Sequence, residues 1–153
     1  MGRQQEKTPF QKWESKVADD HHIRLPSFMM KHPNYISLSP RAKELYQYMK
    51  DWAYYKKSEF IYSASLAESI PILRANGKKE YIKLMSRPAY YKARDELISA
   101  GFLYWKNKPT AQNGKHKHEK GDKCKREKSI FVFVDTWYSG KPYSPPKGKD
   151  DVL

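Results

Sequence analysis

The 153-residue sequence contains a single cysteine, Cys124, so no disulfide can form within the chain. Such a chain suits a reducing compartment, and we expect a cytoplasmic protein. No stretch approaches the roughly 18 apolar residues that a membrane-spanning helix needs. Residues 1–16 also lack the apolar segment of a secretory signal. The composition therefore predicts neither a disulfide scaffold nor a membrane partner.

Sequence motifs of common enzyme classes are also missing. The chain has no glycine-rich phosphate loop, no HExxH motif and no GxSxG motif. Two groups of residues are candidate metal ligands: the pair His21 and His22, and the trio His116, His118 and Cys124. Neither has the four-ligand spacing of a zinc site. We therefore expect no catalytic activity, no metal and no cofactor.

Acidic residues are scarce compared with basic ones. There are 17 of them against 30 lysines and arginines, which gives a formal net charge of +13 and a pI near 9.7. Lysine and arginine release counterions when they bind phosphate backbones, so a strongly basic chain attracts polyanions. The charge predicts a nucleic-acid partner.

The length and a hydrophobic content of 39% suit one domain with one modest core. Residues 1–22 are polar and aperiodic, and we expect a flexible N-terminal arm. The folded domain is expected over 23–138, with a long basic loop at 106–128. The segment 139–153 is rich in glycine and proline, and we expect a disordered C-terminal tail.

Two early segments have helical spacing. Ser39 and Pro40 are suited to cap and begin a helix over 40–55. Ser63 can cap a second helix, which Pro71 should end or kink. The expected inward-facing residues of these two helices are Ala42, Leu45, Tyr46, Met49, Trp52, Ala53, Leu66, Ala67 and Ile70.

A third helix is predicted to begin at Ser86 and to run to Ala100, where Gly101 supplies a left-handed stop. Its expected inward stripe is Tyr90, Ala93, Leu97 and Ile98. The preceding segment 74–80 is typical of a basic turn, whereas the sequence leaves the structure of 81–85 open.

Short strands are expected at 60–62, 102–105 and 129–134, which are rich in β-branched and aromatic residues. Residues 31–34 are typical of a turn, and 36–38 alternate like a short strand or extended segment. The last two strands, joined by a charged loop, predict a β-hairpin with a long tip.

This order of elements resembles the winged helix-turn-helix domains of phages, plasmids and conjugative elements, found in replication-initiator N-terminal domains and in small helix-turn-helix proteins. The resemblance covers 34–137 and is carried by residues 35–45, 60–63 and 90–103, of which the last is the most specific. It implies an α+β fold with a three-helix core, a small antiparallel sheet and a long basic wing. The chain departs from the pattern between Ile70 and Ser86, where the connection is longer than usual.

The third helix would then enter the major groove of DNA. Its outer face is predicted to carry Arg87, Tyr91 and Lys92, with Arg94 flanking, and an arginine can bind guanine through two hydrogen bonds. Asp95 is discordant there, unless it orders an arginine or accepts from cytosine. The loop 106–128 holds nine basic and three acidic residues, a net charge of +6 over 23 residues. Its expected phosphate-binding residues are Lys115, Lys117, Lys120, Lys123, Lys125 and Arg126.

We therefore expect a double-stranded DNA-binding protein of a bacterial mobile element, acting in replication initiation or transcriptional regulation. Two alternatives stay open. One is a winged-helix protein–protein adaptor, and the other is a single-stranded nucleic-acid binder that stacks bases on tyrosines. A homodimer is compatible with the sequence, although no heptad pattern requires one.

Overall fold

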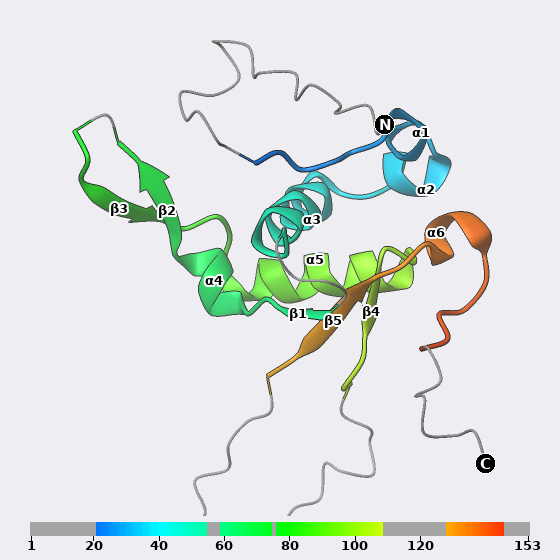
Figure 1. Cartoon of the computed structure of the whole chain (residues 1–153). Coiled ribbons are helices and arrows are strands. Elements are labelled where there is room, and N and C mark those ends of the chain that lie inside the picture. Colours follow the sequence, from blue (N-terminus) through cyan, green and yellow to red (C-terminus); the bar gives the residue numbers. More distant parts are fainter. Residues whose placement is uncertain (1–20, 55–58, 75, 109–127, 146–153) are drawn as a thin grey trace, which may run out of the picture.

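The computed structural model describes residues 21–54, 59–74, 76–108 and 128–145 (Figure 1). Within these ranges the fold is α+β, with short helices and two small antiparallel sheets. The helices are α1 (Ser27–Met30), α2 (Pro33–Ile36), α3 (Pro40–Trp52), α4 (Ala64–Glu68), α5 (Arg87–Ser99) and α6 (Thr136–Ser139). The larger sheet has the order β1 (Glu59–Ile61), β5 (Ile130–Phe133), β4 (Leu103–Trp105), and the smaller one pairs β2 (Ile70–Leu73) with β3 (Lys79–Ile82). No helix in these ranges is both long and apolar enough to cross a membrane.

The predicted first and third helices are confirmed as α3 and α5, which pack against each other. In α3 the hydroxyl of Ser39 accepts a hydrogen bond from the backbone N–H of Ala42, and in α5 that of Ser86 accepts from Ala89. These caps satisfy backbone donors that a helix start leaves unpaired. The expected inward stripes are buried except at two positions: Trp52 is exposed at the last residue of α3, and Ile98 of α5 is only partly buried.

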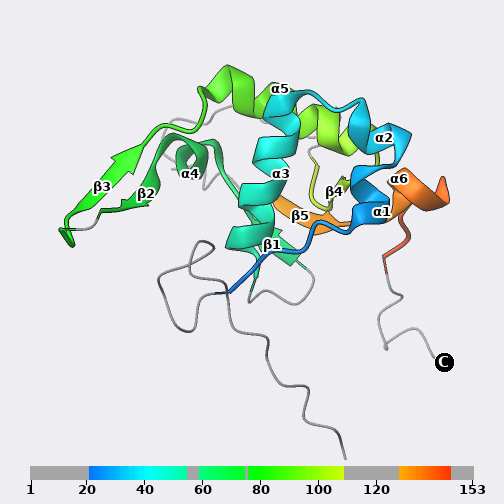
Figure 2. The same ribbon diagram turned by 90° about the horizontal axis from the view of Figure 1, so that it is seen from above.

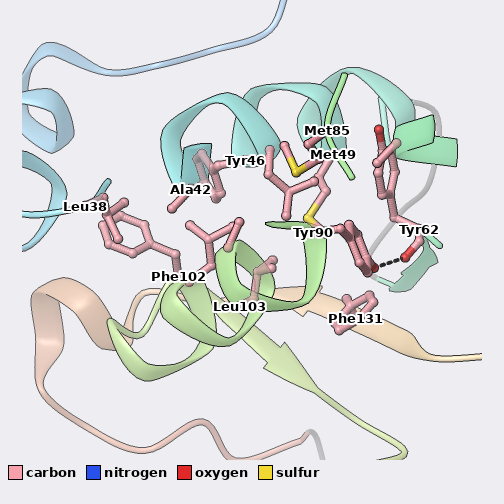
Figure 3. Close-up of a cluster of buried hydrophobic side chains, with 14 of the residues drawn as sticks. Leu38, Ala42, Tyr46, Met49, Tyr62, Met85, Tyr90, Phe102, Leu103 and Phe131 are labelled. Atoms are coloured by element: carbon pink, nitrogen blue, oxygen red, sulfur yellow. Dashed lines mark hydrogen bonds between the residues drawn. The ribbon is translucent and has the colours of Figure 1, made fainter. Parts of the chain in front are cut away.

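The core lies between α3, α5 and the larger sheet, as Figure 3 shows. Its largest fully buried side chains are Phe102, Phe131, Leu45, Met49, Leu97 and Leu103. Phe102 is central, because its ring contacts those of Tyr35, Tyr46 and Trp137. Rings packed edge to face or stacked in this way add directional contacts to apolar burial.

A carboxylate ties α5 to the beginning of α3. Oε1 of Glu96 accepts a hydrogen bond from the backbone N–H of Ser39 at 2.6 Å, and Oε2 accepts from the Ser39 hydroxyl at 2.7 Å. Negative charge is stabilised at a helix N-terminus, where unpaired N–H groups point outward. This pair of bonds fixes the rotation of α5 against α3.

The prediction for the second helix is wrong beyond Glu68. We expected Ile70 to face inward on this helix, but α4 ends at Glu68 and Ile70 begins strand β2. The physical reason is Pro71, which disfavours helical backbone at the residue before it. We expected a turn over residues 74–80. The turn is shorter than that, because strand β3 already begins at Lys79.

The expectation for residues 33–38 is also wrong, whereas Lys31 and His32 form a turn as expected. The predicted turn and short strand are replaced by α2, which begins at Pro33 and buries Tyr35. His32 caps this helix, because its Nδ1 accepts a hydrogen bond from the backbone N–H of Asn34 at 3.2 Å. A proline that signals a turn is equally suited to the first position of a helix.

Gly101 follows α5 and is required there for two reasons. Its φ of +84° is a conformation that side chains disfavour, as predicted for a helix stop. A Cβ at this position would also lie 2.6 Å from the backbone nitrogen of Trp137, whose N–H donates to the Gly101 carbonyl at 3.0 Å. The glycine therefore lets the chain around α6 pack directly on the end of α5.

We expect Gly101→Ala to lower the free energy of unfolding by about 3 kcal/mol, from left-handed strain and the forced movement near Trp137. Gly140→Ala is the matched control, because Gly140 also has a positive φ but has open space around it. The control should cost about 1 kcal/mol from strain alone. Urea unfolding measures both, and equal losses would contradict the close-packing argument.

Candidate nucleic-acid interface

The outer face of α5 brings together three of the predicted DNA-binding residues. Because Tyr90, Ala93 and Leu97 are buried, the opposite side of the helix is exposed. Arg87, Tyr91 and Lys92 lie on this exposed side, with 53% of the Arg87 side chain and 43% of Tyr91 accessible. The helix thus presents two cations and one aromatic ring on its exposed side.

Arg87 is oriented by α4. Its Nε lies 3.0 Å from Oε2 of Glu68, and its Nη2 donates to the hydroxyl of Ser65 at 3.2 Å. A guanidinium has five N–H donors, so these two contacts leave part of the fork able to bind a further acceptor. The ion pair holds Arg87 at the first residue of α5 in a defined direction.

Arg94 is in a different environment from the other three. Its guanidinium lies 5.0 Å from the ring centre of Tyr91 and 4.4 Å from that of Trp105, and only 13% of the side chain is exposed. Its Nε and Nη2 both donate to Oδ1 of Asp95, at 2.9 and 2.8 Å. Asp95, discordant in the sequence, is therefore the ionic partner of Arg94. The arginine connects α5 to strand β4.

The base of the β4–β5 loop is closed by Asn107. Its Oδ1 accepts hydrogen bonds from the backbone N–H of Ile130 at 2.7 Å and from Nε1 of Trp105 at 3.2 Å. Its Nδ2 donates to the carbonyl of Lys128 at 2.8 Å. Sequence reasoning missed this residue, since its partners come from the far end of the loop and no local pattern marks it.

Charged residues also lie at this base. Nζ of Lys106 bonds the carboxylate of Glu59, and this hydrogen bond and charge raise the pKa of the lysine. The remaining predicted cations of the loop lie outside the described residues. They are Lys115, Lys117, Lys120, Lys123, Lys125 and Arg126.

An open groove of about 710 Å³ lies beside the exposed face of α5. It runs between β1, the start of α4, the first half of α5 and the start of β5. Its lining is largely apolar and includes Trp52, Ile61, Tyr62 and Tyr91. The exposed ring of Trp52, which we expected in the core, thus belongs to a surface hollow.

Two buried tyrosines in the lining of the groove, Tyr62 and Tyr90, have a structural role. The hydroxyl of Tyr90 donates to the carbonyl of Tyr62 at 2.5 Å, and burial raises the pKa of Tyr90. Burial also raises the pKa of Tyr62, with smaller contributions from Tyr48 and Asp51, to about 12. Both phenols are therefore protonated at neutral pH. Within the described ranges, no group of three histidine, cysteine, aspartate or glutamate side chains could hold a metal ion.

Comparison with protein-family models, curated proteins and solved structures finds no match to this chain.

Because the Arg94 guanidinium makes cation–π contacts with two rings, we expect Arg94→Lys to lower the free energy of unfolding by about 1 kcal/mol although the charge is kept. Lys92→Arg is the reverse exchange at an exposed neighbour and should change stability by less than about 0.5 kcal/mol. Denaturant unfolding of both variants tests this. An Arg94→Lys protein as stable as the parent would show that the stacking contributes nothing.

Proposed function

We propose that this chain is a winged helix-turn-helix protein that binds double-stranded DNA. The observation that carries the proposal is the exposed face of α5, where Arg87, Tyr91 and Lys92 point away from the core. Apart from the β2–β3 hairpin inserted between α4 and α5, the order α3, β1, α4, α5, β4, β5 supports a winged-helix layout. The net charge of +13 supports a polyanionic partner.

In the proposed mechanism, α5 docks in the major groove and the chain carries out no chemical step. Arg87 lies at the N-terminal end of α5, the part of a recognition helix that contacts base edges, and would bind guanine. Tyr91 and Lys92 would contact phosphates or a thymine methyl group. The lysine-rich loop between β4 and β5 would add contacts to the phosphate backbone, which strengthen binding without reading sequence.

The resemblance of the sequence to domains of mobile elements supports a biological role in replication initiation or transcriptional regulation. Both roles need the same first step, which is duplex binding at a preferred site. The proposal therefore depends on sequence-dependent duplex binding.

The first test is selection of preferred duplexes from a random pool, followed by binding across a salt series. We expect Arg87→Ala to reduce discrimination at one base position by about 1–3 kcal/mol. Arg24→Ala is the matched control, since Arg24 is also exposed but precedes α1, away from α5. Unchanged sequence preference in Arg87→Ala would exclude Arg87 as a base-reading residue, and absence of duplex binding at low salt would overturn the function.

A second test concerns the loop lysines. Changing Lys115, Lys117, Lys120, Lys123 and Lys125 together to alanine should lower the slope of log affinity against log salt by as much as about 4.5, since each phosphate contact contributes about 0.9. Sequence preference should stay the same, because phosphate contacts do not read bases. A slope equal to that of the parent would show that the loop does not touch the backbone.

The groove supports single-stranded nucleic acid as a second candidate partner. Exposed Trp52 and Tyr91 line it, and aromatic rings of this kind stack on bases. Competition between single-stranded and duplex DNA of the same sequence separates the two candidates. Displacement of the duplex by equimolar single strand would favour the groove over the α5 face.

A further inference from the structure

The chain between α4 and α5 forms a β-hairpin that leaves the body of the protein. Strand β2 pairs with β3 in antiparallel register, with Pro71 opposite Tyr81. All four residues of β3 are exposed, and 62% of Tyr81 is accessible. Figures 1 and 2 show the hairpin projecting past the N-terminal end of α5, on the side opposite to α1 and α6.

The hairpin is fixed at its base although strand β3 is exposed along its whole length. The backbone N–H of Leu84 donates to the carbonyl of Ala67 in α4 at 2.9 Å, and Nη1 of Arg41 in α3 donates to the carbonyl of Leu84 at 3.1 Å. Leu84 and Met85 are buried in the core. The direction of the hairpin relative to α5 is therefore set by the packed part of the protein.

The hairpin is also strongly basic. Between Arg74 and Lys83 the chain carries four basic residues and one acidic residue. The acid, Glu80, is paired with Arg74 at 2.9 Å. Within the described ranges, no ion pair involves the other three cations, which are Lys78, Lys79 and Lys83.

We propose that the β2–β3 hairpin is a second phosphate-binding arm, which contacts the DNA backbone beyond the N-terminal end of α5. The inference rests on the proposed duplex binding and adds a contact outside the predicted wing. Four paired residues span roughly 13 Å, comparable with a major groove about 12 Å wide. The hairpin can thus reach phosphates next to the groove that α5 occupies.

Charge favours DNA over a second copy of the chain as the partner of this hairpin. An exposed strand edge can pair with another strand, and an isolated two-stranded hairpin is only marginally stable. Two such hairpins would each bring an excess of three positive charges to one interface. Like charges opposite one another disfavour strand pairing, whereas a phosphate backbone neutralises them.

The test compares two full-length variants that each lose two positive charges. Lys78→Ala with Lys79→Ala changes the hairpin, and Lys31→Ala with Lys141→Ala changes exposed lysines near α1 and α6. The probe is a mixed-sequence duplex of several helical turns, titrated across a salt series. We expect the hairpin variant to bind about tenfold more weakly at low salt and to lose about 2 from the salt slope.

Hydroxyl-radical footprinting on the selected duplex provides the second measurement. The hairpin variant should lose protection at one flank of the site and keep it at the centre, while the control variant should keep both. Thermal unfolding should be unchanged in both variants, because all four lysines are exposed.

Each result has a distinct meaning. If the hairpin variant matches the control variant in affinity, salt slope and footprint, the hairpin does not bind phosphates and the inference is overturned. In that case, duplex binding by the parent protein still leaves the proposed function intact. Absence of duplex binding by the parent overturns the proposed function and the arm together. A change of molar mass in light scattering, with the salt slope unaltered, would identify the hairpin as a protein contact and also overturn the inference.

Discussion

The rest of the structure depends on how α5 is held against α3, and a carboxylate decides this. The carboxylate of Glu96 in α5 accepts hydrogen bonds from the backbone N–H and from the hydroxyl of Ser39. Ser39 is also the residue that caps α3. Towards the other end of α5, the Tyr90 hydroxyl binds the Tyr62 carbonyl just after β1. Apolar burial is non-directional, so it would allow α5 to rotate and still bury Ala93 and Leu97. The two polar ties remove that freedom and thereby determine which residues face outward.

The position of α5 also governs the elements that follow it. Gly101 lets the chain around Trp137 pack on the end of the helix, and the Phe102 ring then lies parallel to that of Trp137 with centres 5.4 Å apart. Arg94 couples the outer face of α5 to β4 through Trp105. A cation on the outer side of α5 can therefore serve mainly to align the helix with the neighbouring strand. Arg87, held by Glu68 but half exposed, keeps the capacity to bind outward.

Features were predictable from the sequence where the residues that cause them lie within one short segment. Ser39, Ser86 and Gly101 act on backbone groups within a few residues, so the ends of the helices they define were predictable. Contacts between residues far apart in the sequence were not predictable. The bond between Glu96 and Ser39, and the stacking of Arg94 on Trp105, depend on the packing of separate elements, and no periodicity encodes them. The strand at Ile70 was not predicted, because Pro71 marks the end of a helix as readily as it fits an edge strand.

The β2–β3 hairpin and the β4–β5 loop are connected to opposite ends of the same helix, α5. The hairpin leads into the N-terminal end of α5 through the buried residues Leu84 and Met85. The β4–β5 loop follows the other end through Gly101 and β4, and Asn107 closes its base. Each basic segment is therefore anchored to the same helix through short, packed connections. A duplex lying along the outer face of α5 would meet cations before and after the helix, and the spacing of the phosphates it contacts would be set by the rigid core between them.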